Sequence, residues 1–600
     1  MGMKANKVNS ALLKPTRLAM ALVTLGCIHS AHAVELKLGD DWTGNFDTTV
    51  SYGAAWRASK ADASVIGVGN GGTSATVNAD DGDLNFRRGH MVSNAVRATH
   101  ELELARDGFG LFGRVTYGYD EVATRDRISA LGESKDQVGY DARLLDLYGR
   151  FNGELGGKQF AARIGQQVVN WGESMFIQNG LSVINPFDLS TLHAPGTELR
   201  EAYIPTPMAW ASQQLTPNAS VEGFVLFKAD HHRLEPRGTF FSTNDVLSGR
   251  AGTGANSDRI YLNGMMPDQR GLDASALPVF AGGTGQFWVD RTTTRTAEVS
   301  DQFGVSFRQA FPEWNQLEMG LYALQYTSRV PFLSFKAAAG GVPPSSAMFG
   351  IGGASYFVEY PSRIQLYGVS GRLQGPFGLA LQGEYSYRPN QPVQRSVSDL
   401  AVVAATAGLL GSPVAGTEMQ GYDRVGMHQI QLSGTKTFSS VLGAETSALA
   451  AEVGYTHLDL RKGVYYDAPG VTMLSPALAA AMGSAAQTTG FLTRDSWGYV
   501  VFYQLEYSDL IAGAKLSPRL AFSHDVHGSG PTFNQGVKSL SLGASLTSAD
   551  KNWKFDLSYT NYFGGRNYEI TDATTGYTFS STSNLLKDRD FIAASLSYAF

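Results

Sequence analysis

Charged residues recur at alternate positions in the first third of the chain, an arrangement that places them on one face of extended strands. If Gly156 and Gly157 form the centre of a hairpin, Arg150 and Arg163 lie opposite each other. Two guanidinium groups so placed repel each other unless they are neutralised or bind a carboxylate or phosphate through paired hydrogen bonds. The residues predicted to share this face are Arg97, Glu101, Glu103, Arg114, Asp120, Asp146, Arg150 and Arg163.

A neutralising network is the alternative to anion binding for this face. Asp146 lies on the same predicted strand as Arg150, and Glu101 is expected to face Arg114. These carboxylates would balance the arginines within the wall and leave no site for a ligand.

A second candidate site is the segment Trp171-Gly172-Glu173-Ser174, which opens a loop rich in apolar residues. Such a loop is too apolar to extend into water, so it is expected to fold inward or to cap an opening. Glu173 would then be a polar group in a confined space. A packed interior loop with Glu173 bonded to backbone amides is the competing interpretation.

Enzymatic and metal signals are weak. Asp80-Asp81-Gly82-Asp83 contains carboxylates for Ca²⁺ but lacks the rest of a loop ligand set. His231-His232 is interpreted as surface polarity at a strand-to-loop junction rather than as a metal pair. The nucleophile elbow, the zinc-protease helix and the P-loop are missing, as is a dinucleotide fingerprint between a strand and a helix. We therefore expect no enzymatic activity, no cofactor and no metal.

Strands with two distinct faces must position these residues. The last residues place Phe600, Tyr598, Leu596, Ala594 and Ile592 on one face and small or polar residues on the other. The same alternation appears around residues 540–546 and 553–560, and early in the chain at 111–120 and 145–152, where Leu145, Leu147 and Phe151 oppose Asp146, Tyr148 and Arg150. One face suits lipid and the other water.

Short and long connections alternate between these strands. Short turns are predicted near residues 106–108, 156–158, 217–218, 312–315, 375–378, 439–444, 510–513 and 549–552. Long loops are predicted at about 58–90, 122–140, 171–205, 230–298, 331–360, 390–424, 461–495, 527–536 and 564–588. This pattern predicts an all-β fold, a transmembrane antiparallel up-and-down β-barrel of about 18 strands with both ends on the periplasmic side.

The N-terminus is typical of a secretory signal peptide. Lysines and an arginine precede the apolar run Leu18 to Ile28, and Ala31-His32-Ala33 forms a cleavage site, so residues 1–33 are expected to be removed. The only cysteine, Cys27, lies within this segment. No later stretch reaches 18 continuous apolar residues, so a membrane location requires a closed barrel formed by residues 34–600.

Several motifs resemble one known family. Arg163 to Ser174, Asn185-Pro186-Phe187-Asp188 and Pro195 to Glu201 look like the domain of unknown function 1302 family, and Phe46 to Gly53 and Asp81 to Phe86 fit it too. The resemblance covers essentially the mature chain. It implies a proteobacterial outer-membrane or envelope protein, often encoded beside inner-membrane exporters, and it supplies no catalytic or ligand residues.

Five loops are candidates for a plug, a gate or a mouth: 171–205, 230–298, 331–360, 390–424 and 461–495. Ser475 to Gly483 and Asp399 to Leu410 are predicted to form short helices. Together with Phe332, Leu333 and Phe335 they would make a hydrophobic collar, or they would merely pack against neighbouring loops or lipopolysaccharide.

A net charge of -6 with 17% charged residues excludes a basic nucleic-acid binder. The leading hypothesis is an outer-membrane channel or transport component for a small organic solute, hydrophobic or anionic in character, that diffuses through a loop-gated lumen. A structural or adhesive barrel with a plugged lumen and, less strongly, a barrel hydrolase are the alternatives. Expected partners are outer-membrane lipid and lipopolysaccharide, the barrel assembly machinery through the C-terminal strand, an inner-membrane exporter and the solute. The lumen residues expected to meet that solute are Arg97, Glu101, Arg114, Asp146, Arg150, Arg163, Trp171 and Glu173.

Overall fold

The computed structural model describes residues 34–39, 41–125, 134–247, 258–262, 288–296, 301–338, 354–405, 414, 416–481, 486–571 and 578–600. The proposed signal peptide, with Cys27, lies outside these residues. No helix among the described residues is long and apolar enough to cross a membrane.

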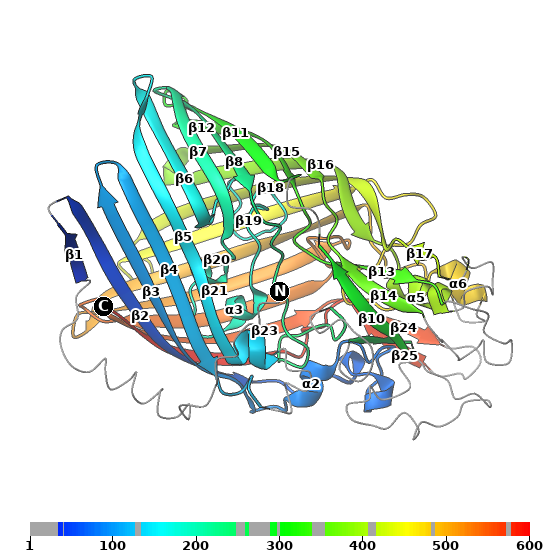
Figure 1. The fold of residues 1–600 in the computed structure, drawn as a ribbon. Coiled ribbons are helices and arrows are strands. Elements are labelled where there is room, and N and C mark those ends of the chain that lie inside the picture. Colours follow the sequence, from blue (N-terminus) through cyan, green and yellow to red (C-terminus); the bar gives the residue numbers. More distant parts are fainter. Residues whose placement is uncertain are drawn as a thin grey trace, which may run out of the picture.

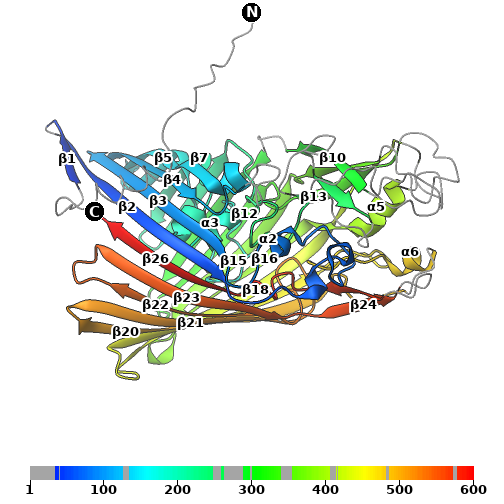
Figure 2. The same ribbon diagram turned by 90° about the horizontal axis from the view of Figure 1, so that it is seen from below.

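Eighteen antiparallel strands of the described chain close into a barrel, as the sequence predicts (Figures 1 and 2). The circle closes where β2 pairs with β26, from Thr49 opposite Ala599 to Arg57 opposite Phe591. The barrel strands, in order around the wall, are β2 (Trp42–Arg57), β3 (Met91–Arg106), β4 (Phe109–Asp120), β5 (Tyr140–Leu155), β6 (Lys158–Gln167), β7 (Thr206–Thr216), β8 (Ala219–Leu226), β11 (Phe303–Phe311), β12 (Leu317–Tyr326), β15 (Ile364–Gln374), β16 (Ala380–Gln394), β18 (Tyr422–Ser439), β19 (Thr446–Leu458), β20 (Asp495–Ile511), β21 (Ala514–His527), β22 (Val537–Thr547), β23 (Trp553–Gly564) and β26 (Phe591–Ala599).

One further strand, β1 (Val34–Leu38), forms a hairpin with the first residues of β2. It lies beside β2 beyond the end of β26, at the same end of the barrel as the C-terminus (Figure 1). The sequence pattern gave no sign of this extra strand.

All eight predicted short turns connect strands at one end of the barrel, and the long loops connect them at the other. In the two-residue turn between β5 and β6, both Gly156 and Gly157 have positive φ, as a type I′ hairpin turn requires. This turn fixes the register that places Arg150 directly opposite Arg163, which confirms the predicted hairpin.

The outer face of the wall is apolar, and the alternation predicted from the sequence determines it. Trp553, Phe555, Leu557 and Tyr559 on β23 are 36–46% exposed on the outside, while the intervening Asp556, Ser558 and Thr560 point into the lumen. One residue departs from the prediction. Leu145, expected on the outer face, is buried because a bulge in β5 turns both Leu145 and Asp146 inward.

The long loops build a cap over one end of the barrel, seen on the right of Figure 1. Three of them contribute a five-stranded sheet of β9 (Arg259–Tyr261), β10 (Trp288–Arg295), β13 (Phe332–Lys336), β14 (Ser355–Glu359) and β17 (Glu418–Met419). Helix α5 (Val397–Ala405) shares its loop with β17. The two-stranded β24 (Asn567–Thr571) and β25 (Thr578–Thr582) and the short helices α2 (Asp81–Asn85) and α6 (Pro476–Ala481) lie in other loops, whereas α3 (Leu189–His193) and α4 (Leu199–Ala202) lie between β6 and β7.

The predicted hydrophobic collar forms the interior of this cap. α6 confirms the predicted helix after Ser475, and α5 confirms the first part of the other, whose residues 406–410 lie outside the described chain. Leu333 and Phe335 pack with Leu400, Tyr356 and Val289 in a buried apolar cluster. These side chains contact one another and do not line an open mouth.

Asp467 makes the stability of the cap depend on pH. Its carboxylate accepts the backbone N–H of Val397 at the start of α5, at 2.8 Å. Burial, reinforced by the nearby Asp399, raises the pKa of Asp467 to about 8. In the unfolded loop this pKa is about 3.9. The folded cap therefore binds the extra proton, and its stability falls as the pH rises from about 4 to about 8.

We predict that Asp467→Asn removes this pH dependence. In the native protein, the opening equilibrium measured by hydrogen exchange at the Val397 amide should increase by roughly tenfold per pH unit across this window. The asparagine variant should show a flat opening equilibrium. Glu418→Gln, an exposed substitution on the same cap, should keep the native slope; an unchanged slope in the asparagine variant would contradict the assignment.

Candidate functional site: a strap across the lumen

Residues 171–202, here called the strap, leave the wall after β6 and cross the lumen before the chain returns at β7. The strap begins on the far wall. Glu384 on β16 accepts the backbone N–H groups of Glu173 (2.6 Å), Ser174 (3.0 Å) and Leu181 (2.8 Å). A single buried carboxylate thus holds three amides that would otherwise lack partners.

A second buried carboxylate on this wall repeats the arrangement. Glu452 on β19 accepts the N–H groups of Met175 (3.2 Å), Phe176 (2.6 Å) and Ile177 (2.8 Å). On the strands beside it, Arg388 donates to the carbonyls of Asn179 and Gly180, and Gln431 donates to that of Ile177. Within residues 173–181, six N–H groups and the four carbonyls of residues 177–180 are therefore held by inward side chains.

Two glycines allow the backbone of the strap to lie this close to the Glu384 carboxylate. Gly172 has φ +93°, and a Cβ atom there would lie 2.4 Å from a carboxylate oxygen of Glu384. A Cβ at Gly180 would lie 1.9 Å from the other oxygen. Position 172 of the Trp171-Gly172-Glu173-Ser174 motif is therefore a glycine because a side chain there would clash with Glu384 and the positive φ favours glycine.

The first half of the strap forms an apolar cluster with another part of the wall. Trp171 is buried, packs 4.9 Å from the ring of Phe224 and donates its indole N–H to Glu222 at 3.1 Å. The cluster consists of Val169, Trp171, Leu181 and Ile184 from the loop and Met208, Phe224, Leu226, Tyr322, Leu324, Tyr326, Ile364 and Leu366 from β7, β8, β12 and β15. Trp171 is therefore a packing residue at its predicted position inside the barrel.

The end of the strap binds the wall on the opposite side. Asp188 pairs with Arg143 of β5 at 3.0 Å, and Glu201 accepts a hydrogen bond from Thr99 of β3 at 2.6 Å. The carbonyl of Pro195 lies so close to β2 that a Cβ at Gly53 would meet it at 2.2 Å. The strap thus spans the lumen from β16, β18 and β19 to β2, β3 and β5.

The predicted lumen charges neutralise one another. Arg114 bonds to both Glu101 (3.0 Å) and Asp146 (2.8 Å), and Arg97 bonds to Asp141 (3.0 Å). The Glu101–Arg114 pair was expected from the sequence, whereas Asp146 pairs with Arg114 rather than with Arg150.

The two opposed arginines are held apart in different ways. Arg150 pairs with Glu103 at 2.5 Å, while the Arg163 guanidinium lies 4.3 Å from the Trp210 ring centroid. Binding an anion between them would require these contacts to break, so the geometry favours the neutralising network over an anion site.

Glu173 has two roles that the sequence could not separate. Its backbone N–H belongs to the group that Glu384 holds, whereas its side chain faces Arg372 and Arg308. Partial burial raises the pKa of Glu173, and the two arginines oppose that rise. The competing interpretation was that the Glu173 carboxylate bonds to backbone amides. In the structure, the carboxylate with that role is Glu384.

Two polar cavities flank the strap. One, of about 890 Å³, lies against β2, β3, β26 and β20 to β23 and is lined by Ser51, Thr99, Ser517, Ser545, Ser595 and Ser597 together with the ion-paired Arg519 and Asp556. The other, of about 850 Å³, lies against β5 to β8, β11, β12 and β15 and is lined by Ser212, Ser220, Glu222, Arg308, Glu318 and Arg372. The two cavities share no lining residue and lie against different arcs of the wall; they are called the larger and the smaller compartment below.

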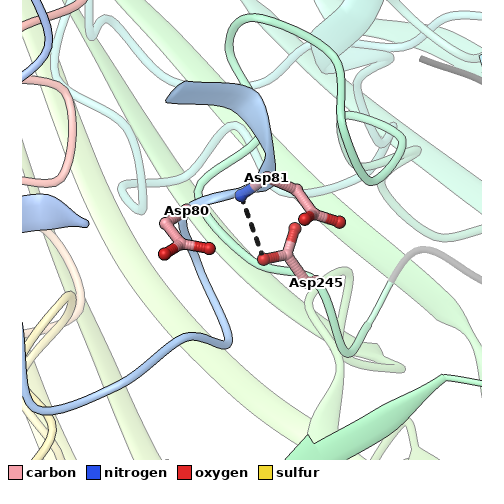
Figure 3. Close-up of side chains that lie close together, drawn as sticks. All are labelled: Asp80, Asp81 and Asp245. Atoms are coloured by element: carbon pink, nitrogen blue, oxygen red, sulfur yellow. Dashed lines mark hydrogen bonds between the residues drawn. The ribbon is translucent and has the colours of Figure 1, made fainter. Parts of the chain in front are cut away.

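An acidic cluster outside the lumen joins two loops of the cap (Figure 3). Ligand atoms of Asp80, Asp81 and Asp245, all buried, lie within 4.8 Å of one another, and the Asp81 N–H donates to Asp245 at 3.4 Å. Burial raises the pKa of Asp80 to about 7. Asp81 pairs with Arg237, whereas Asp83 turns away to pair with Arg57 and Arg589. The Asp80 to Asp83 run is therefore split between two ionic networks that hold loops together.

The histidine pair lies below the surface rather than on it, contrary to the prediction. His231 stacks on Tyr360 with ring centroids 3.5 Å apart, and His232 accepts the Phe187 N–H at 2.8 Å. Burial lowers the pKa of both imidazoles to about 4, so they are neutral near pH 7. They support the end of the strap through Phe187.

Sequence reasoning missed the anchors of the strap: Glu384, Arg388, Gln431, Glu452 and Arg143 with its partner Asp188. A usable signal was present, because ionisable residues at inward positions in the middle of a strand require partners from inside the barrel. The partners were backbone amides, which no side-chain pattern marks.

The similarities to known proteins extend over nearly the whole chain. No curated protein matches it. Among solved structures, it is similar to the outer membrane channel DcaP of Acinetobacter baumannii (8% identity, 94% of this chain and 99% of that chain, TM-score 0.33). It is also similar to Pseudomonas aeruginosa OccK9 (10%, 93% and 98%, TM-score 0.39) and to P. aeruginosa OpdK with vanillate (10%, 93% and 98%, TM-score 0.38). A family model described as "Protein of unknown function (DUF1302)" matches residues 14–600, so the chain belongs to that family.

Proposed function

We propose that this protein is an outer-membrane channel through which a small organic solute diffuses past the strap. The observation that carries the proposal is the polar cavity of about 890 Å³ between the strap and the wall of a closed 18-strand barrel. A barrel of this size is wide enough to enclose an aqueous passage, and the strap narrows it without filling it.

The two faces of the wall support this location and activity. The outward side chains are apolar, as contact with lipid requires, and the inward ones are polar over most of the circumference. A soluble protein with so much apolar surface would associate or precipitate. An inward polar surface is costly in a packed core but suits a hydrated lumen.

A structural barrel with a plugged lumen is the second candidate. The cap supports it, because a five-stranded sheet and several apolar clusters cover the loop end of the barrel. The two candidates differ in one measurable property: the channel conducts ions and solutes, and the plugged barrel does not.

The proposal includes partners. The strand that ends at Phe600 carries outward aromatic and aliphatic residues, and we propose that the barrel assembly machinery recognises it. Outer-membrane lipid would surround the wall, and lipopolysaccharide would contact the loops. We also propose an inner-membrane exporter as a partner on the periplasmic side, on the basis of the family resemblance.

We predict that the purified full-length protein forms steady channels in planar bilayers and makes liposomes swell in small sugars faster than in oligosaccharides. The barrel supplies the pore, and the strap sets its size limit. Heat-denatured protein serves as the control. Absence of both conductance and swelling, with a folded barrel shown by its heat-dependent mobility in electrophoresis, would establish the plugged alternative.

We predict that Glu384→Ala combined with Glu452→Ala increases single-channel conductance by about twofold and makes the current noisier. Hydrogen bonds to a charged group contribute about 1.5–3 kcal/mol each, so loss of six frees the strap. Hydrogen exchange at the amides of residues 173–181 should rise in parallel.

Glu506→Ala is the matched control for this experiment. Glu506 is a glutamate of the wall that lines a cavity, but it pairs with Lys515 rather than with the strap. It should leave the exchange of the strap amides unchanged. If the double variant releases these amides and the current stays the same, the strap does not limit conduction.

A further inference from the structure

The strap contacts the lumen wall unevenly around its circumference. Its hydrogen bonds and close packing reach β16, β18 and β19 at one end, β2, β3 and β5 at the other, and β7, β8, β12 and β15 between them. Among the described residues, no hydrogen bond, ion pair or ring contact joins the strap to β21, β22 or β23. At the loop end of this arc the strap bonds to the β21–β22 loop instead, where Asn179 donates to Pro531 and Thr532.

A polar inward surface continues from the larger cavity along this arc. On β22 the inward positions run from Thr547 and Ser545, which line the cavity, to Gly543, Ser541 and Ser539. On β23 they run from Asp556 to Ser558 and Thr560. All of these side chains are small or short, and none of them is buried.

Hydrogen bonds keep this surface flat. The hydroxyls of Ser523 and Ser539 pair across strands at 2.8 Å, and those of Ser541 and Thr560 pair at 3.0 Å. The Arg519 guanidinium lies over Gly543, where a Cβ would be 2.8 Å from it, and binds both oxygens of Asp556 at 2.7 and 2.9 Å. Because Arg519 and Asp556 pair along the wall, this stretch presents hydroxyls and a neutral ion pair to the lumen, while Lys551 and Lys554 line the cavity nearer the short turns.

The smaller cavity ends differently. Above Ser220 and Glu222 on β8 come Phe224 and Leu226, and above Glu318 on β12 come Tyr322 and Leu324. These four side chains are at most 5% exposed because they belong to the apolar cluster that Trp171 closes. Polar space on this side of the strap therefore leads into a sealed apolar cluster.

We infer that the solute passes along a lane on β21, β22 and β23, that the compartment on the other side of the strap is blind, and that the lane selects small hydrophilic solutes without net charge. The inference deepens the proposed function and rests on it. Hydroxyl groups donate and accept hydrogen bonds, so they replace the hydration of sugars and other neutral polar molecules. They offer nothing to an apolar solute, and the paired charges offer no net attraction to an ion.

Single-cysteine variants test the lane, because Cys27 is the only cysteine of the chain and is replaced by alanine in the background. Ser541→Cys and Ser545→Cys place a thiol in the lane, and Ser220→Cys places one in the opposite compartment. Reaction with a charged methanethiosulfonate should reduce single-channel current by roughly half in the two lane variants. The current of Ser220→Cys should stay unchanged, with labelling confirmed by mass spectrometry.

An accessibility readout keeps the test independent of conduction. Ser306 faces inward on β11 beside Tyr322, but it is buried under the apolar cluster. In folded protein in vesicles, Ser541→Cys should react at least about tenfold faster than Ser306→Cys with the same hydrophilic reagent.

The outcomes separate the two claims. Current loss in Ser220→Cys equal to that in the lane variants, or no current loss in fully labelled lane variants, overturns the lane. Equal reactivity of Ser541→Cys and Ser306→Cys overturns it even if the protein does not conduct. Absence of conductance in every variant, with fast labelling of Ser541→Cys, overturns the proposed function while the open lane stands.

Discussion

Closure of the sheet by β2 and β26 is the constraint on which the rest of the structure depends. In the hydrocarbon of a membrane, backbone N–H and C=O groups find no water, so a spanning sheet must have no free edge. Thr48 and Phe600 exchange two backbone hydrogen bonds, at 2.7 and 2.9 Å, where the first and last barrel strands meet. With all 18 strands paired, every second side chain points inward, and an enclosed space follows from geometry alone.

The strap faces the same requirement inside that space. A segment without regular structure carries unpaired amides, and the barrel meets this need with carboxylates that project from the wall. Glu384 and Glu452 each hold three N–H groups, and Arg388 holds two carbonyls. The consequence is an asymmetric lumen, in which the strap bonds to one arc of the wall and, among the described residues, makes no such bond to β21, β22 or β23.

The wall could be predicted from the sequence because it follows a two-residue period. Leu557 and Ser558, or Arg150 and Arg163, are placed by alternation and turn position alone. The inward position of Leu145 was not predicted, because a bulge adds one residue to β5 and breaks the two-residue period locally. The strap residues that contact the wall could not be paired in advance, since a glutamate that binds backbone amides leaves no trace in the sequence of the segment it binds. Gly172 and Gly180 are the strap residues whose type this contact explains, because a side chain at either position would clash with Glu384.

Recognition of the strap through its backbone has an evolutionary consequence. The anchoring carboxylates contact amide groups that every residue except proline possesses, so an exposed side chain of this segment can be exchanged without loss of these bonds. Met175 and Phe176, both partly exposed, are the positions freest to vary. Members of the family that keep the two glutamates and the glycines beside them can therefore change what the passage accepts by altering a few side chains, with the framework unchanged.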